Sequence, residues 1–177
     1  MTGISLKNVT KAYDKNEVIK DYDLVIPEGD VHYITGPSGS GKTTLLRLIA
    51  GLEKPDKGSI EGVPERIGMV FQEDRLVETL SAVENVYLVL SRKDADRKVI
   101  KEHLLMVGLS KDQLDNPVST FSGGMKRRVA VVRAMMSDSE LVLLDEPFSG
   151  LDEDTKTLVT DYIMKQKKGR TLMIATH

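Results

Sequence analysis

The chain has 177 residues, 25 basic and 27 acidic side chains, and no cysteine. This length suits one domain with a buried core, and the lack of cysteine excludes a disulfide framework and a thiolate metal site. The near balance of charge does not imply a general attraction to nucleic acid or anionic lipid. No apolar run is long enough to cross a bilayer, so we expect any membrane connection to pass through a partner.

The first third of the chain predicts strands and a phosphate-binding loop. Apolar residues predict strands over residues 4–9, 18–26 and 31–35, with a turn over residues 27–30. Residues 36–43, GPSGSGKT, then fit the pattern GxxxxGK[ST] at every fixed position. The apolar residues behind this loop recur at helical spacing: Leu45, Leu48, Ile49 and Leu52.

This loop has the chemistry of a nucleoside triphosphate site. Its glycines let backbone N–H groups turn inward around a phosphate, and the helix N-terminus adds partial positive charge. Lys42 can reach the terminal phosphates, and the Thr43 hydroxyl can hold the accompanying Mg²⁺. A plain Gly/Ser-rich turn needs neither side chain, so we expect nucleotide binding. The candidate residues are Gly36, Pro37, Ser38, Gly39, Ser40, Gly41, Lys42, Thr43 and Thr44.

The middle of the chain predicts a strand and then helices. A turn over residues 55–58 precedes a strand over residues 67–71, which ends at Gln72. Ser81 and Glu84 have the spacing of a helix capping box. A second helix, at about residues 94–107, places His103 on an apolar face, where we expect a packing role.

Residues 122–124, Ser-Gly-Gly, open a further predicted helix. Ser122 suits the N-cap, and the glycines leave backbone donors unshielded, which favours a second anion site. Lys126, Arg127 and Arg128 crowd the first turn, where each cation opposes the helix dipole by about 0.3–1 kcal/mol. Two interpretations remain open: a bound anion relieves this conflict, or the side chains extend into solvent.

Residues 141–144 predict a buried strand that ends at two acids, Asp145 and Glu146. Ligands of parallel α/β sheets bind at the carboxyl ends of strands, so we expect Asp145 to anchor Mg²⁺ and Glu146 to polarise the attacking water. Alone, two acids could simply end a strand. A helix over residues 153–168 and a strand over residues 171–175 follow, and the alternation predicts an α/β fold with a mainly parallel sheet.

With these segments in order, the sequence resembles the ATP-binding cassette (ABC) ATPases over essentially the whole chain. Residues 121–125, FSGGM, are similar to the family's signature LSGGQ, with Met125 in place of the glutamine. Gln72 resembles the Q-loop glutamine, residues 149–152 resemble the D-loop, and His177 resembles the switch histidine. Tyr13 lies where the family has an aromatic residue that stacks on adenine.

The resemblance implies a set of site residues and two cofactors, ATP and Mg²⁺. Glu146, His177 and Gln72 are expected to be catalytic, and Thr43, Gln72 and Asp145 to hold the metal. Besides the phosphate loop, the expected nucleotide contacts are Tyr13, Ser122, Gly123, Gly124, Met125 and Asp152. The implied domain is a single ABC nucleotide-binding domain over residues 1–177, truncated after His177. It would consist of a P-loop NTPase core with a mainly parallel sheet, an N-terminal antiparallel β subdomain and a helical insertion at about 75–137.

The resemblance also implies a transport role. The signature of one chain is expected to cover the γ-phosphate held by a second chain in a head-to-tail homodimer. Residues 71–76 and 145–148 are similar to bacterial importers of the nitrate, sulfonate and taurine type. The expected partners are membrane permease subunits, met through residues after Gln72 to about Tyr87, and an extracytoplasmic solute-binding protein. The expected location is cytoplasmic, on the inner face of the membrane, without nucleic acid.

Two other functions are compatible with a phosphate loop. A soluble ABC-type ATPase that acts on nucleic acid or ribosomes would usually carry a coiled-coil insertion or tandem cassettes, and neither pattern is visible. A P-loop kinase or GTPase is disfavoured by the Ser-Gly-Gly motif and by the lack of an NKxD-like guanine motif.

Overall fold

The computed structural model describes residues 3–14, 16–91 and 95–177, and the chain divides into two compact units. The first, called here the sheet unit, consists of Met1–Ile67, Ser139–Asp145 and Gly169–His177. The second, the helical unit, consists of Gly68–Asp138 and Glu146–Lys168. One of the crossings between the units falls between the adjacent acids Asp145 and Glu146.

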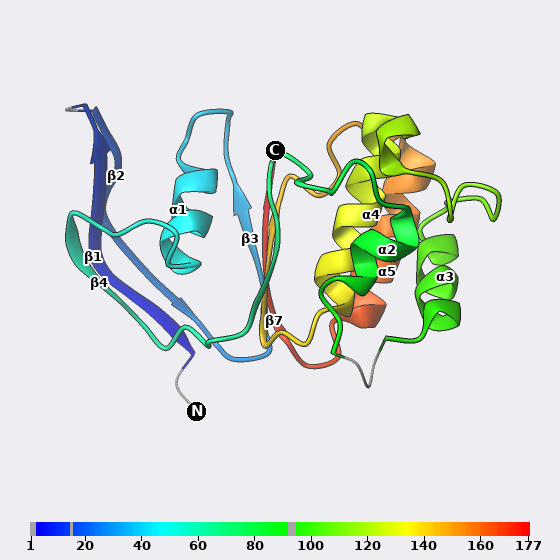
Figure 1. Cartoon of the computed structure of the whole chain (residues 1–177). Coiled ribbons are helices and arrows are strands. Elements are labelled where there is room, and N and C mark those ends of the chain that lie inside the picture. The colour runs from blue at the N-terminus through cyan, green and yellow to red at the C-terminus, as the bar shows by residue number, and fades with distance from the viewer. Residues whose placement is uncertain (1–2, 15, 92–94) are drawn as a thin grey trace. The chain divides into compact units, whose positions relative to one another are not determined.

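An antiparallel sheet in the sheet unit has the strand order β2-β1-β4 (Figure 1). Its strands are β1 (Ile4–Tyr13), β2 (Asn16–Ile26) and β4 (Lys57–Glu61). β1 and β2 extend beyond the predicted ranges because they pair along their whole length, while bulges interrupt the alternation of apolar residues. β4 has no counterpart in the sequence prediction, since it carries one aliphatic residue, Ile60, and a glycine with φ of 81°, Gly58. Pairing with β1 therefore decides its structure.

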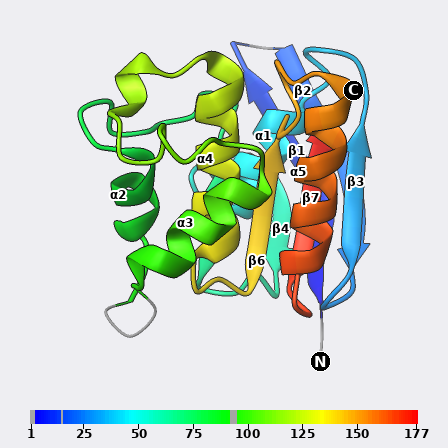
Figure 2. The same ribbon diagram turned by 90° about the vertical axis from the view of Figure 1, so that its right-hand side faces the viewer.

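Three parallel strands of the same unit run in the order β3-β7-β6 (Figure 2). They are β3 (Val31–Thr35), β7 (Thr171–Thr176) and β6 (Leu141–Asp145), and all five residues of β6 are buried. The predicted parallel sheet is confirmed. Thr35 pairs with Thr176, and Asp145 pairs with Ala175. The start of the phosphate loop, Asp145 and His177 therefore lie at the same edge of this sheet, where the three strands end.

Helix α1 (Lys42–Ile49) packs on β6, β7 and β2 through four buried aliphatic side chains. The prediction that Leu52 continues this apolar face is wrong, because the helix ends at Ile49 and Leu52 is 57% exposed. Gly51, with φ of 68°, follows the C-cap residue and stops the helix. Further along the chain, β5 spans Ile67–Val70, one residue shorter than predicted.

The helical unit contains α2 (Ala82–Tyr87), α3 (Arg97–Met106), α4 (Gly123–Met136), α5 (Glu153–Gln166) and a short 3-10 helix, η1 (Val118–Thr120). α4 packs against the other three α-helices. Ser81 and Glu84 form the predicted capping box of α2. Asp96 caps α3, whereas the predicted start at residue 94 lies outside the described residues. Within the described ranges, no helix has the length and apolar character needed to span a bilayer.

His103 of α3 has the packing role expected from the sequence. Its Nδ1 lies 2.7 Å from the Tyr162 hydroxyl of α5, and the two rings meet edge to face. Burial, followed by the nearby Lys168 ammonium, lowers the pKa of His103. This pair therefore joins α3 to α5, and its burial favours the neutral form of the imidazole.

Candidate active site

The phosphate loop joins the end of β3 to the start of α1 within the sheet unit. Lys42 is buried, and its ammonium donates to the carbonyls of Gly36 at 2.6 Å and Pro37 at 3.1 Å. These contacts hold the positive charge against the loop's own backbone. Pro37, Ser38, Gly39 and Ser40 are exposed, so a ligand can reach the loop from solvent.

Gly41 leaves the start of α1 accessible to an anion. It is the N-cap residue, with φ of 89°, and it supplies no side-chain hydrogen bond to the first N–H groups of the helix. A Cβ at this position would lie 3.0 Å from the backbone oxygen and from a methyl group of Val18. Glycine thus satisfies both the left-handed backbone and the tight packing, and it leaves the helical donors for a ligand.

Asp145 has the surroundings of a metal-binding carboxylate. It is 1% exposed at the end of β6, and neither carboxylate oxygen has a hydrogen-bond partner among the described residues. A buried charge without a partner is costly, so a cation ligand would compensate it. Thr43 lies half-buried in the first turn of α1, which packs on the strand that ends at Asp145. These two oxygen donors fit Mg²⁺, which takes few protein ligands and keeps water and phosphate as the others.

The described residues contain no cluster of three or more acidic or histidine side chains that could cage a metal by themselves. A magnesium site at Thr43 and Asp145 would therefore need nucleotide phosphates to complete it. This is the behaviour expected of an ion that enters with its substrate.

Tyr13 lies at the end of β1, is 41% exposed, and donates a hydrogen bond to Glu53. Burial and this bond raise the pKa of Tyr13, while a hydrogen bond with Thr44 of α1 lowers it. The ring is thereby held beside the first turn of α1. Glu53 is not among the site residues expected from the sequence. The one local pattern that points to it is the opposite charge of Arg47, whose guanidinium lies 3.6 Å from the Glu53 carboxylate.

Glu146 follows directly after Asp145 and begins the next segment of the helical unit. It is half-buried and adopts a left-handed backbone with φ of 50°, which is uncommon for a residue with a side chain. Its carbonyl accepts a hydrogen bond of 3.1 Å from the Ser149 N–H, which closes a turn. Such strained residues occur often at functional sites.

The Ser-Gly-Gly motif opens α4 as predicted. The Ser122 hydroxyl accepts a hydrogen bond of 3.3 Å from the Met125 N–H, which makes Ser122 the N-cap. Ser122 and Gly123 are exposed, and the space beside Gly123 is open. The backbone donors at this end of α4 are therefore accessible to a ligand.

Asp152 caps the following helix. Its carboxylate accepts hydrogen bonds from the Thr155 N–H at 2.8 Å and from the Thr155 hydroxyl at 3.0 Å, and these bonds lower the pKa of Asp152. The side chain is exposed, so it remains within reach of a ligand or a partner.

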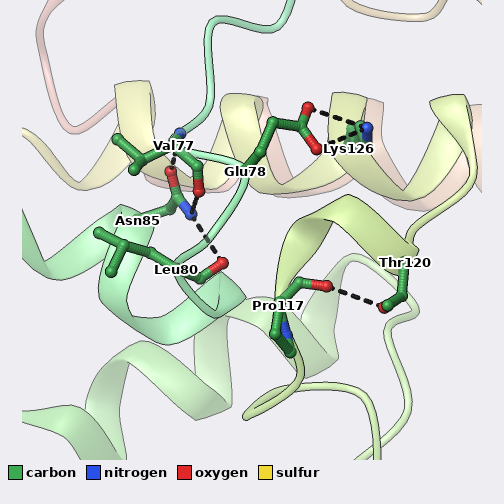
Figure 3. A network of polar contacts seen from close by, with 7 residues as sticks. All are labelled: Val77, Glu78, Leu80, Asn85, Pro117, Thr120 and Lys126. Carbon is green, nitrogen blue, oxygen red and sulfur yellow. Dashed lines mark hydrogen bonds and ion pairs between the residues drawn. The ribbon is translucent and has the colours of Figure 1, made fainter.

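The three cations in the first turn of α4 all have partners inside the helical unit, Arg127 at a buried position and Lys126 and Arg128 at partly exposed ones. Lys126 pairs with both carboxylate oxygens of Glu78, at 2.9 and 3.0 Å (Figure 3). Arg128 donates to the carbonyls of Val107 and Gly108 at the end of α3. Arg127 donates to the carbonyls of Phe71 and Gln72. These partners offset part of the opposition between the cations and the helix dipole.

Gln72 follows β5 and has an exposed side chain, while Arg127 binds its carbonyl. The sequence pattern does not indicate two further contacts of this segment, the ion pair between Asp74 and Arg127 and the hydrogen bond from Arg133 to the Asp74 carbonyl. The predicted residues divide between the units. The sheet unit holds Tyr13, the phosphate loop, Thr44, Asp145 and His177; the helical unit holds Gln72, the signature with Met125, Glu146 and Asp152.

Comparison with known proteins connects these motifs to one family. Residues 19–149 match the family described as ABC transporter. The aliphatic sulfonates import ATP-binding protein SsuB 1 of Pseudomonas savastanoi pv. phaseolicola (strain 1448A / Race 6) is 37% identical over 180 residues, which cover 98% of this chain and 74% of that protein. The Fe(3+) ions import ATP-binding protein FbpC of Escherichia coli O157:H7 is 40% identical, over 98% of this chain and 54% of that protein.

A solved structure supports the same relationship. The dimeric ATP-binding cassette MJ0796, in a post-hydrolysis state bound to ADP and Pi, is similar with a TM-score of 0.86 and 32% identity. The similarity covers 98% of this chain and 88% of that one.

Proposed function

Since this chain belongs to the ABC transporter family of ATP-binding cassette ATPases, we propose that it is the ATP-hydrolysing subunit that powers a bacterial solute importer. The relatives described above, which are named as import ATP-binding proteins, support this role. The observation that carries the proposal is that the start of the phosphate loop, Asp145 and His177 lie together at one edge of the parallel sheet.

ATP binding falls to the phosphate loop and Tyr13. The N–H groups of the loop and of the first turn of α1 would surround the β- and γ-phosphates, and Lys42 would exchange its two carbonyl contacts for phosphate oxygens. Tyr13, fixed by Glu53, would stack on the adenine ring.

Thr43, Asp145 and Gln72 would hold Mg²⁺, which supplies positive charge against the phosphates when it is bound. Glu146 would polarise the water that attacks the γ-phosphate and accept its proton. His177, which follows β7 directly, would contact the same phosphate from the sheet unit. The unusual backbone of Glu146 supports a functional role for this carboxylate.

A second copy of the chain would complete the site. The exposed N-terminus of α4 at Ser122, Gly123 and Gly124, followed by Met125, would cover the γ-phosphate bound by the partner, and Asp152 would lie at the same interface. Two helix N-termini would then share one triphosphate, so closure of the dimer would depend on ATP and end with hydrolysis.

Permease subunits are the proposed membrane partners. The segment from Gln72 to Tyr87 exposes the apolar side chains of Val77 and Tyr87, and Leu88 beside it is 59% exposed. Apolar side chains at a surface favour a protein partner. We place the protein on the inner face of the membrane, with an extracytoplasmic solute-binding protein delivering cargo to the permease.

The variant Glu146→Gln tests this function. It keeps the size of the side chain but removes the charge that polarises water, so ATP-bound dimers should accumulate while phosphate release falls by about a hundredfold or more. Size-exclusion chromatography with Mg-ATP and a phosphate assay measure the two effects. Glu153→Gln, at an exposed position in the first turn of α5, is the control. Wild-type phosphate release from Glu146→Gln would contradict the assigned role.

A further inference from the structure

Two arginines of α4 fasten the segment that carries Gln72 to the helix that begins at the signature. Arg127 donates from Nη1 to the Phe71 carbonyl at 2.6 Å and from Nη2 to the Gln72 carbonyl. Arg133 donates from Nη2 to the Asp74 carbonyl and from Nη1 to the Arg75 carbonyl, both at 2.9 Å. Two guanidinium groups therefore bind four backbone oxygens within residues 71–75.

The cluster is partly buried and its charges are matched. Arg127 is 7% exposed, and its Nε lies 3.1 Å from the Asp74 carboxylate in an ion pair. Burial raises the pKa of Asp74, and the charges of Arg127, Lys126 and Arg133 oppose that rise. A guanidinium withdrawn from water needs compensating partners. Here two backbone oxygens accept its hydrogen bonds, and one carboxylate lies beside it in an ion pair.

Residues 71–75 also contact one another, through Arg75 and Phe71. Arg75 has a left-handed backbone with φ of 47°, and its guanidinium lies 3.9 Å from the centre of the Phe71 ring. The side chain of Gln72 nevertheless stays exposed. The main chain around Gln72 is thus held from α4 while its side chain remains available to a ligand.

We propose that Arg127 is a positioning residue that makes the Gln72 segment and α4 move as one piece. A displacement of the Gln72 backbone must either break the hydrogen bonds to Arg127 or carry α4, and with it the Ser122 end, in the same direction. Binding at Gln72 is thereby converted into a movement of the signature. The proposal deepens the function proposed above and rests on it. Lysine could not replace Arg127 fully, since it lacks the planar fork that binds two carbonyls at once.

Hydrogen exchange of the amides of residues 72–75, measured without nucleotide, tests whether Arg127 holds this segment to α4. Arg127→Gln should speed their exchange by about tenfold or more, because it removes charge-assisted bonds, and Arg127→Lys should give an intermediate effect. Lys126→Gln is the matched control: it loses the same charge next to Arg127, but its partner is Glu78, outside residues 71–75 (Figure 3). Unchanged exchange in Arg127→Gln would overturn the proposal. If that variant does not fold, wild-type exchange in Arg127→Lys would do so.

A double-mutant cycle with Gln72→Ala tests whether binding at Gln72 reaches the signature through Arg127. Arg127→Gln should lower kcat for Mg-ATP by about tenfold with little change in KM, and the double variant should be no slower than Gln72→Ala alone, because both changes remove one function. Independent, multiplying losses would overturn the proposal, as would a wild-type kcat in Arg127→Gln. A wild-type chain that does not hydrolyse ATP would instead refute the proposed function, while the exchange result would still decide the fastening.

Discussion

The carbonyl oxygen of Gly150 lies 3.0 Å from the point where a Cβ on Gly124 would stand. The second glycine of the signature is therefore packed against the D-loop inside the helical unit, and a Leu151 methyl group lies 3.3 Å from the same point. Gly123 has no neighbour within 4 Å of its Cβ position. The two glycines of one motif thus meet different requirements, close packing at Gly124 and open space at Gly123.

Gly124→Ala should lower the free energy of unfolding by about 1–3 kcal/mol, because the backbone of Gly150 must move to admit the methyl group. Gly123→Ala is the matched control, and in open space it should leave stability unchanged or raise it by about 0.4–1 kcal/mol. Urea denaturation of both variants makes the comparison. Equal stability of the two would show that the D-loop yields freely to the added methyl group.

Lys42→Ala should weaken ATP binding by about a hundredfold, because it removes the cation that would bind the terminal phosphates. Titration with a fluorescent ATP analogue measures the effect. Lys57→Ala removes the same charge from an exposed position of β4 in the same unit and should bind the analogue normally. If both variants bind equally, the phosphate loop is not the nucleotide site.

Asp145→Asn should affect stability and activity in opposite directions. The protein without nucleotide should become more stable, because a buried charge without a hydrogen-bond partner is removed. Each kcal/mol gained in the free energy of unfolding should raise Tm by about 2–4 °C. Mg²⁺-dependent ATP hydrolysis should fall steeply, since the neutral amide binds the cation poorly. Thermal unfolding and an assay over a range of Mg²⁺ concentrations separate the two effects. A lower Tm together with normal Mg²⁺ dependence would contradict the assignment of Asp145 as a metal ligand.

His103 should make stability depend on pH in the acidic range. Its pKa is lowered in the folded state by burial, so between that value and the unfolded value of 6.5 the unfolded chain binds more protons. The free energy of unfolding should therefore fall as the pH drops below 6.5. Urea denaturation at pH 7.5 and 5.5 should show a smaller difference for His103→Gln than for wild type. Tyr162→Phe, which keeps the imidazole, should retain the pH dependence, and an identical difference in all three proteins would exclude His103 as its source.

Local sequence patterns predict much of this fold because they report local physics. The phosphate loop and its flanking strand and helix are encoded by glycines and apolar spacing, and the capping box at Ser81 depends on two residues in one turn. β4 and the early end of α1 at Ile49 depend on pairing with β1 and on a left-handed Gly51, which a periodic pattern does not report. Long-range contacts were hardest to predict. Nothing near Arg127 in the sequence indicates that its partners lie more than 50 residues earlier, at Phe71 and Gln72.

Asp152 caps α5 by accepting two hydrogen bonds from Thr155, so its capping role and its negative charge can be changed separately. Asparagine and serine start helices about as well as aspartate does, so either replacement would preserve the shape of the loop while deleting its negative charge. Electrostatic repulsion or attraction across the proposed subunit interface could then be adjusted at this one position without disturbing the path of the main chain.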